Sequence, residues 1–196
     1  MRKLLHIIFI LLTPNYAFSQ KVKWNSQQSI GLLIDYPITS EKLPESTARV
    51  YRPILFQVNL RFPLLKKYER NQLTFQLQPQ FNYVMKVEGL DLFFFEYGLN
   101  CGLAYEYYFH RNAIFYTGIG TGPHYVNIET SYQKNGYIFS NNGFVGLHQL
   151  LGKSKWMMNY EVRFRHISNA GLQIPNSGID NFFVGVGLSK FINSYK

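Results

Sequence analysis

Apolar and polar side chains alternate with a period of two along residues 72–85, and this pattern constrains the fold more than any other feature of the chain. One parity carries Leu73, Phe75, Leu77, Phe81, Tyr83 and Met85, and the other carries Thr74, Gln76, Gln78, Gln80 and Asn82. Successive side chains of a strand point to opposite faces. The pattern therefore predicts a β-strand with one apolar face and one polar face.

Similar segments recur along the whole chain and are separated by turn-rich links. The predicted strands are 29–36, 53–62, 72–85, 93–109, 113–122, 137–151, 156–168 and 181–191. Most are close to the roughly 9–11 residues that a tilted membrane strand needs. The facing of 113–122 is less certain than that of the others, and the parity of 137–151 is ambiguous. The eight segments predict an even-numbered set of antiparallel strands.

The first residues resemble an export signal. Arg2 and Lys3 precede a short apolar run over 4–12, and Ala17-Phe18-Ser19 forms a small-x-small cleavage site. This arrangement is typical of a secretory signal peptide. We expect residues 1–19 to be the signal peptide and residues 20–196 to form one domain.

The composition indicates which kind of exported protein this is. Aromatic residues make up 17% of the chain and charged residues only 16%, whereas soluble proteins average about 25% charged. No segment after the signal is long and apolar enough for a membrane helix. We therefore predict an all-β protein, an eight-stranded antiparallel up-and-down transmembrane β-barrel of the outer membrane. A soluble β-sandwich is the alternative.

The net charge of +9 raises the possibility of a nucleic-acid-binding protein. Export removes that partner, and the basic residues are scattered instead of gathered in one patch. We expect no nucleic-acid partner, and we expect the basic residues to meet the anionic head groups of outer-membrane lipids. The single cysteine, Cys101, falls on an apolar parity and is expected to face lipid.

The lengths of the links predict the orientation of the barrel. The links at 66–71, 110–112 and 152–155 are short, and those at 37–51, 123–136 and 169–179 are longer. Membrane barrels keep short turns in the periplasm and longer loops outside. The strand 156–168 then runs outward, and His124 is expected in an external loop.

Three polar residues near the end of that strand share the lipid-facing parity. His166 and Ser168 continue the apolar parity of 156–168, and Asp180 continues that of the following strand, its hairpin neighbour. Ser168 as nucleophile, His166 as base and Asp180 as the group that orients the imidazole make a candidate catalytic triad for acyl transfer. An ordinary rim position, where the side chains meet head groups and water, is the alternative.

An ester-cleaving site also needs donors for the oxyanion. The side-chain amide of Asn169 and the backbone N–H groups of Ala170 and Gly171 are the nearest candidates in the sequence. No ligand cluster for a metal is evident, so we expect neither a metal nor another cofactor.

The segment from His166 to Asp180, HISNAGLQIPNSGID, resembles the signature of the lipid A 3-O-deacylase (PagL-type acyloxyacyl hydrolase) family. The resemblance implies an eight-stranded outer-membrane enzyme that hydrolyses the ester-linked 3-O acyl chain of lipid A, so lipopolysaccharide is the expected substrate. It implies His166 as base, Ser168 as nucleophile and Asn169 at the oxyanion. The family's acidic residue is typically Glu, and the position is Asp180 here.

Two alternatives stay open at this point. One is a related hydrolase that acts on phospholipid, and the other is a non-catalytic barrel that serves as an adhesin, a channel or a structural protein. The sequence leaves the oligomeric state open.

Overall fold

The computed structural model describes residues 27–38, 51–68, 70–84, 94–129, 133–152 and 154–192. The predicted signal peptide at 1–19 lies outside the described residues. The strands are β1 (Ser29–Pro37), β2 (Pro53–Tyr68), β3 (Asn71–Val84), β4 (Phe94–His110), β5 (Ala113–Val126), β6 (Gly136–Leu150), β7 (Trp156–Ser168) and β8 (Ile179–Phe191). Among the described residues, no helix is long and apolar enough to cross a membrane.

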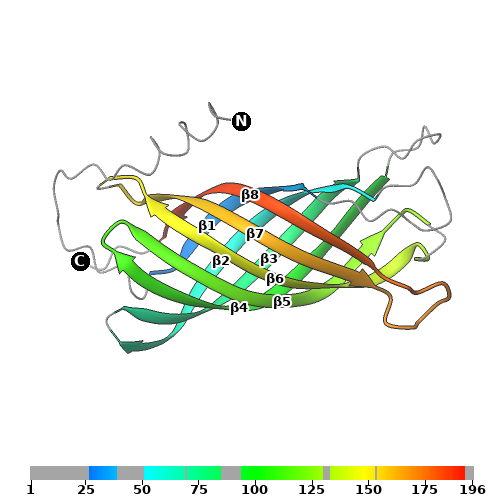
Figure 1. The fold of residues 1–196 in the computed structure, drawn as a ribbon, viewed down its shortest axis with the longest axis horizontal. Helices are drawn as coiled ribbons and strands as arrows, with labels where there is room; N and C mark the ends of the chain where they lie inside the picture. The colour runs from blue at the N-terminus through cyan, green and yellow to red at the C-terminus, as the bar shows by residue number, and fades with distance from the viewer. Residues whose placement is uncertain are drawn as a thin grey trace.

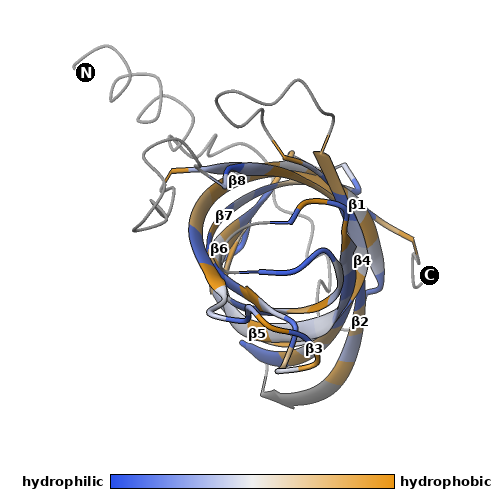
Figure 2. Cartoon of the chain, turned by 90° about the vertical axis from the view of Figure 1, so that its right-hand side faces the viewer, coloured by the Kyte–Doolittle hydropathy of each residue, from blue (hydrophilic) through white to orange (hydrophobic). Residues whose placement is uncertain are grey.

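The eight strands form one closed barrel (Figure 1). Each strand pairs antiparallel with the next in sequence, and β1 pairs with β8, so that Ser29 lies opposite Phe191. The view from one end shows the closed ring (Figure 2). Closure leaves no unpaired sheet edge, which a strand structure in lipid requires. The predicted fold is confirmed.

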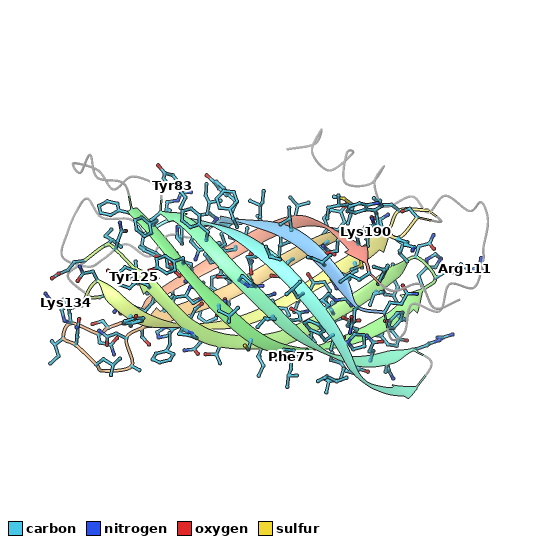
Figure 3. The ribbon with its side chains drawn as sticks, turned by 180° about the vertical axis from the view of Figure 1, so that it is seen from behind. Phe75, Tyr83, Arg111, Tyr125, Lys134 and Lys190 are labelled. Atoms are coloured by element: carbon cyan, nitrogen blue, oxygen red, sulfur yellow. The ribbon has the colours of Figure 1, made fainter. Side chains whose placement is uncertain are left out.

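The two ends of the barrel differ. The turn end carries the links 111–112 and 151–155, and the loop end carries the links 127–135 and 169–178. Tyr83, Tyr125 and Lys134 lie near the loop end, whereas Arg111 and Lys190 lie near the turn end (Figure 3). Because membrane barrels keep their short turns in the periplasm, we expect the loop end to face the cell exterior.

The prediction for His124 is wrong. We expected the fifth strand to stop at Gly122 and residues 123–136 to form a loop. Instead β5 continues to Val126, and His124 lies inside the barrel, almost fully buried. Pro123 has no backbone N–H to donate, and the β4–β5 register has a gap at this point, between the Gly98–His124 and Cys101–Thr121 pairs.

The outer wall is apolar and carries aromatic side chains near both ends. Near the loop end, a chain of ring contacts runs across four strands from Phe81 through Phe95, Tyr97 and Tyr125 to Tyr137. Near the turn end, exposed aromatic side chains include Tyr105, Tyr107, Phe109, Phe115 and Trp156. Two aromatic bands around an apolar wall are typical of a membrane barrel. Cys101 is exposed on this wall, as predicted.

The lumen is filled by charged and polar side chains in hydrogen-bonded groups. Arg61 pairs with Glu106, Arg163 with Glu161, and Arg165 with Glu96, and all six side chains are buried. Apolar side chains close the loop end; this cluster comprises Tyr51, Val84, Phe94, Val126, Ile128, Ile138, Ile167 and Ile179. A small barrel is packed by its own side chains in this way, and the packing argues against an open channel.

Candidate active site

A histidine–carboxylate pair lies on the outer wall near the loop end. His166 near the end of β7 lies directly opposite Asp180 at the start of β8, and the imidazole Nδ1 is 2.7 Å from Asp180 Oδ1. Both residues belong to the outward parity of their strands, since the intervening Ile167 and Ile179 are buried. A carboxylate at Nδ1 fixes the imidazole tautomer that leaves Nε2 able to take a proton.

Ser168 lies on the same outward parity of β7, two residues beyond His166. Within the described part of the chain, its hydroxyl makes no hydrogen bond, either to the imidazole or to another group. Nucleophile–base contacts are often longer in structures without substrate and close when it binds. The structure therefore brings His166 and Asp180 into contact and places Ser168 beside them, without the final hydrogen bond.

Gly178 is a part of the site to which the sequence analysis gave no role. The β7–β8 register ends at the Ile167–Ile179 pair, and extending it by one residue places Gly178 opposite Ser168. A Cβ built on Gly178 would lie 2.9 Å from His166 Nε2 and closer still to Cε1. Its φ of +76° is also one that glycine adopts readily. The missing side chain therefore leaves room for the Cε1–Nε2 edge of the His166 imidazole.

The three predicted oxyanion residues lie in the link that follows Ser168. The Asn169 side chain is buried, and it donates from Nδ2 to Gln173 O (2.8 Å) while Oδ1 accepts the Gly171 N–H (3.0 Å). Ala170 has a left-handed φ of 53° and, among the described residues, its N–H makes no hydrogen bond. Two of the three candidates are thus already used to shape the turn.

Asn176 holds the start of this turn, although sequence reasoning assigned it no role. Its Oδ1 accepts the Asn169 backbone N–H at 2.8 Å, and the residue forms an isolated β-bridge with Gln133 of the neighbouring link. A second backbone contact, Lys134 N to Pro175 O at 3.4 Å, joins the same two links. The turn beside Ser168 is therefore tied to the rest of the loop end.

A second histidine–carboxylate pair lies inside the barrel, on β4 and β5. His124 Nδ1 is 2.7 Å from Glu96 Oε1, and the other ring nitrogen is 3.2 Å from Asn100 Oδ1. Glu96 also contacts Arg165 and accepts hydrogen bonds from Tyr51 and Asn82. This buried pair is part of the packing of the lumen. His148, also in the lumen, contacts Asn159 Oδ1 at 2.7 Å.

No group of three or more metal-ligating side chains occurs among the residues that the structure describes. The side chains at the outer site are a hydroxyl, an imidazole and a carboxylate, the residue types that acyl-transfer enzymes use.

A comparison with models of protein families identifies the family of this chain. The model of the family described as lipid A 3-O-deacylase (PagL) matches residues 54–189, more than half of the chain. The chain belongs to the lipid A 3-O-deacylase (PagL) family. A comparison with curated protein sequences finds no match.

Solved structures agree with this membership at the level of fold. The crystal structure of the outer membrane enzyme PagL has a TM-score of 0.56 and 16% sequence identity, with 81% of this chain and 97% of that chain covered. The crystal structure of Neisserial surface protein A has a TM-score of 0.60 and 8% identity, with 86% and 97% covered. At these low sequence identities, the two TM-scores show that the barrel fold is shared and nothing more. Family membership and barrel together place the chain in the outer membrane, as a member of a family of lipid A deacylases.

Proposed function

We propose that this protein is a serine-type esterase that removes the ester-linked 3-O acyl chain of lipid A in the outer leaflet. The observation that carries the proposal is the His166–Asp180 contact of 2.7 Å on the outward face, with Ser168 beside it at the loop end. A polar group on a lipid-facing wall costs free energy unless it meets head groups, so polar groups retained there suggest a function. Membership of the lipid A 3-O-deacylase family supports the choice of substrate.

The reaction follows from the positions of the three groups. Ser168 Oγ attacks the ester carbonyl carbon while His166 Nε2 takes the hydroxyl proton, and Asp180 stabilises the imidazolium that forms. The tetrahedral intermediate collapses, the sugar alkoxide leaves with the proton from His166, and the acyl group stays on Ser168. Water then attacks the acyl-enzyme with His166 as base, which releases a free fatty acid and restores Ser168.

The oxyanion donors come from the turn that follows Ser168. The Ala170 N–H is the candidate with no hydrogen bond among the described residues. Asn169 Nδ2 bonds Gln173 O through one N–H, and an amide nitrogen has a second N–H to offer. Gly171 would have to leave Asn169 Oδ1 before its N–H could serve. We therefore propose Ala170 and Asn169 ahead of Gly171.

Mass spectrometry of lipid A from cells that express the protein tests the proposal. We expect wild type to remove one ester-linked acyl chain and Ser168→Ala to remove none. Ser177→Ala is the matched control, because Ser177 is an exposed serine of the same link but lies outside β7. Heat-modifiable gel mobility shows that each variant forms a folded barrel.

Two outcomes would contradict the proposal. Unchanged lipid A with altered phospholipids would identify a phospholipid hydrolase that uses the same site. Unchanged lipids of both kinds, with a folded barrel in the outer membrane, would favour a non-catalytic role.

A further inference from the structure

Two more polar side chains stand on the lipid-facing wall, next to His166. Asn141 of β6 lies directly opposite His166, and Thr121 of β5 lies directly opposite Asn141. Both are exposed, and the Thr121 hydroxyl donates to Asn141 Oδ1 at 2.7 Å. Directly opposed residues of neighbouring strands have Cβ atoms about 4.5–5.5 Å apart. Asn141 is therefore within reach of a substrate whose ester lies at His166.

This polar row descends into the membrane as it leaves the catalytic residues. β7 ends at Ser168, just beyond His166, whereas β5 runs on from Thr121 to Val126 before it reaches the loop end. Thr121 therefore lies deeper in the wall than His166 does. An ester held at head-group depth would have its acyl chain run in this same direction, from the polar interface toward the hydrocarbon core.

A groove continues from the polar row along the outer wall. It has a volume of ≈ 680 Å³, and its lining includes Asn141, Thr121, Gly143, Phe164 and Ile119. Gly143 lies between Ile119 and Phe164 in the pairing of β5, β6 and β7, and a Cβ built on it meets nothing within 4 Å. The absence of a side chain at this outward position leaves the groove open. Phe75, which also lines the groove, stands between the two ends of the barrel (Figure 3).

The hydrogen bond between Thr121 and Asn141 determines what the pair can bind. Because the threonine proton is directed to Asn141 Oδ1, the threonine lone pairs remain available as acceptors. Within the described part of the chain, Asn141 Nδ2 makes no hydrogen bond, so its N–H groups remain available as donors. A hydroxyl both donates and accepts, so it matches both groups, whereas a plain hydrocarbon chain matches neither.

We propose that Thr121 and Asn141 are specificity-determining residues that bind a hydroxyl on the first carbons of the acyl chain, while the groove over Gly143 takes the rest of that chain. This inference depends on the proposed esterase function, because it assigns the path along which the acyl chain extends from the ester at Ser168. The competing explanation is that the pair meets water or lipid head groups, in which case it does not distinguish one acyl chain from another.

A pair of matched substrates tests the hydroxyl site. The full-length protein, refolded in mixed micelles, is assayed for kcat/KM on two lipid esters that differ only in a hydroxyl near the ester carbonyl. We expect wild type to prefer the hydroxylated ester by about tenfold, the effect of one net hydrogen bond of about 1.4 kcal/mol. Thr121→Val is expected to remove this preference by slowing the hydroxylated ester alone.

Thr117→Val is the matched control for this substitution. Thr117 is another exposed threonine of β5, but its hydroxyl bonds Phe144 O at 3.2 Å and it lies farther from His166 along the strand. We expect it to leave both rates unchanged. A wild type that cleaves both esters equally, or a Thr121→Val variant that slows both equally, would overturn the hydroxyl site.

Gly143→Leu tests the groove separately, because the new side chain points into open space outside the barrel. We expect kcat/KM to fall at least tenfold for a long acyl chain and to stay unchanged for a short one. An equal effect on both lengths would overturn the groove. Failure of wild type to cleave any lipid A ester would instead refute the proposed function, so the two failures are distinguishable.

Discussion

Two histidine–carboxylate pairs of equal length lie near the loop end, one on the outer face of β7 and β8 and one on the inner face of β4 and β5. The ring nitrogen and carboxylate oxygen are 2.7 Å apart in both His166–Asp180 and His124–Glu96. The side chains are 37% and 52% exposed in the outer pair and 0% exposed in the inner pair. A short contact therefore does not identify a catalytic base. The two pairs differ in their exposure and in the second ring nitrogen, which in His124 contacts Asn100 Oδ1.

The surroundings of the two carboxylates predict different roles for them. Glu96 contacts the buried Arg165 as well as His124, so removing it would leave a guanidinium without its counter-charge. Breaking a buried ion pair from one side is strongly destabilising. An exposed pair such as His166–Asp180 contributes little to stability. The inner pair is thus expected to control folding, and the outer pair to control chemistry.

Substituting each histidine in turn should show the largest contrast in activity. His166→Ala removes the base, and we expect kcat to fall by about 10⁴-fold or more while the barrel stays folded. His124→Ala should leave kcat unchanged and lower the free energy of unfolding by about 1–3 kcal/mol, because Glu96 loses a buried partner. Lipid A deacylation rates and urea unfolding measure the two effects. Equal losses of activity would contradict the distinction.

The carboxylate of the outer pair should have the next largest effect. Asp180→Asn keeps the shape of the side chain but no longer fixes the imidazole tautomer, so we expect kcat to fall by about 10²–10⁴-fold. Asp180→Glu should retain most of the activity, because it restores the charge on a longer side chain. Steady-state kinetics on the purified barrel give both values. Near-normal turnover in Asp180→Asn would remove Asp180 from the triad.

A substitution at Gly178 should show how tightly the outer imidazole is placed. A methyl group at this position would press on the Cε1–Nε2 edge of His166. We expect Gly178→Ala to lower kcat by about 10–100-fold through misplacement of the base. Gly171→Ala, a left-handed glycine of the same link with open space around its Cβ, controls for backbone strain. Equal effects of the two variants would assign the loss to strain instead of crowding.

The smallest effect on activity is expected inside the barrel. Glu96→Gln leaves Arg165 without its counter-charge, so we expect the free energy of unfolding to fall by about 3–5 kcal/mol. At a temperature where the barrel stays folded, kcat should equal that of wild type. The transition temperature of the heat-modifiable gel band and the deacylation rate are measured on one preparation. A kcat that falls while the barrel is fully folded would link the lumen to the active site.

The alternating pattern was sufficient to predict the barrel, because each strand has one face in lipid and one in the lumen. It also gave the outward parity of His166, Ser168 and Asp180. The parity of β6 was ambiguous because Asn141 and Asn142 are both polar and Gly143 and Gly146 lack side chains. Only the register between β6 and β7 shows that Asn141 faces outward, opposite His166.

The turn after Ser168 was the part least accessible to sequence reasoning. Asn169 was expected to offer its amide to the substrate, and in the structure that amide also organises the turn through Gln173 and Gly171. Hydrogen bonds within an irregular link leave no periodic trace in a sequence. The position of Gly178 is predictable, because extending the His166–Asp180 pairing by two residues places it opposite Ser168.

β7 alternates Arg163 and Arg165 inward with Phe164 and His166 outward, and this order links correct assembly to the proposed activity. A one-residue slip of this strand would turn both guanidinium groups toward hydrocarbon and bury the imidazole in the lumen. Such a barrel would be disfavoured and inert at the same time. The same register error therefore removes the imidazole from the outer face and destabilises the strand in the bilayer. A misassembled, inactive barrel is not expected to persist in the membrane.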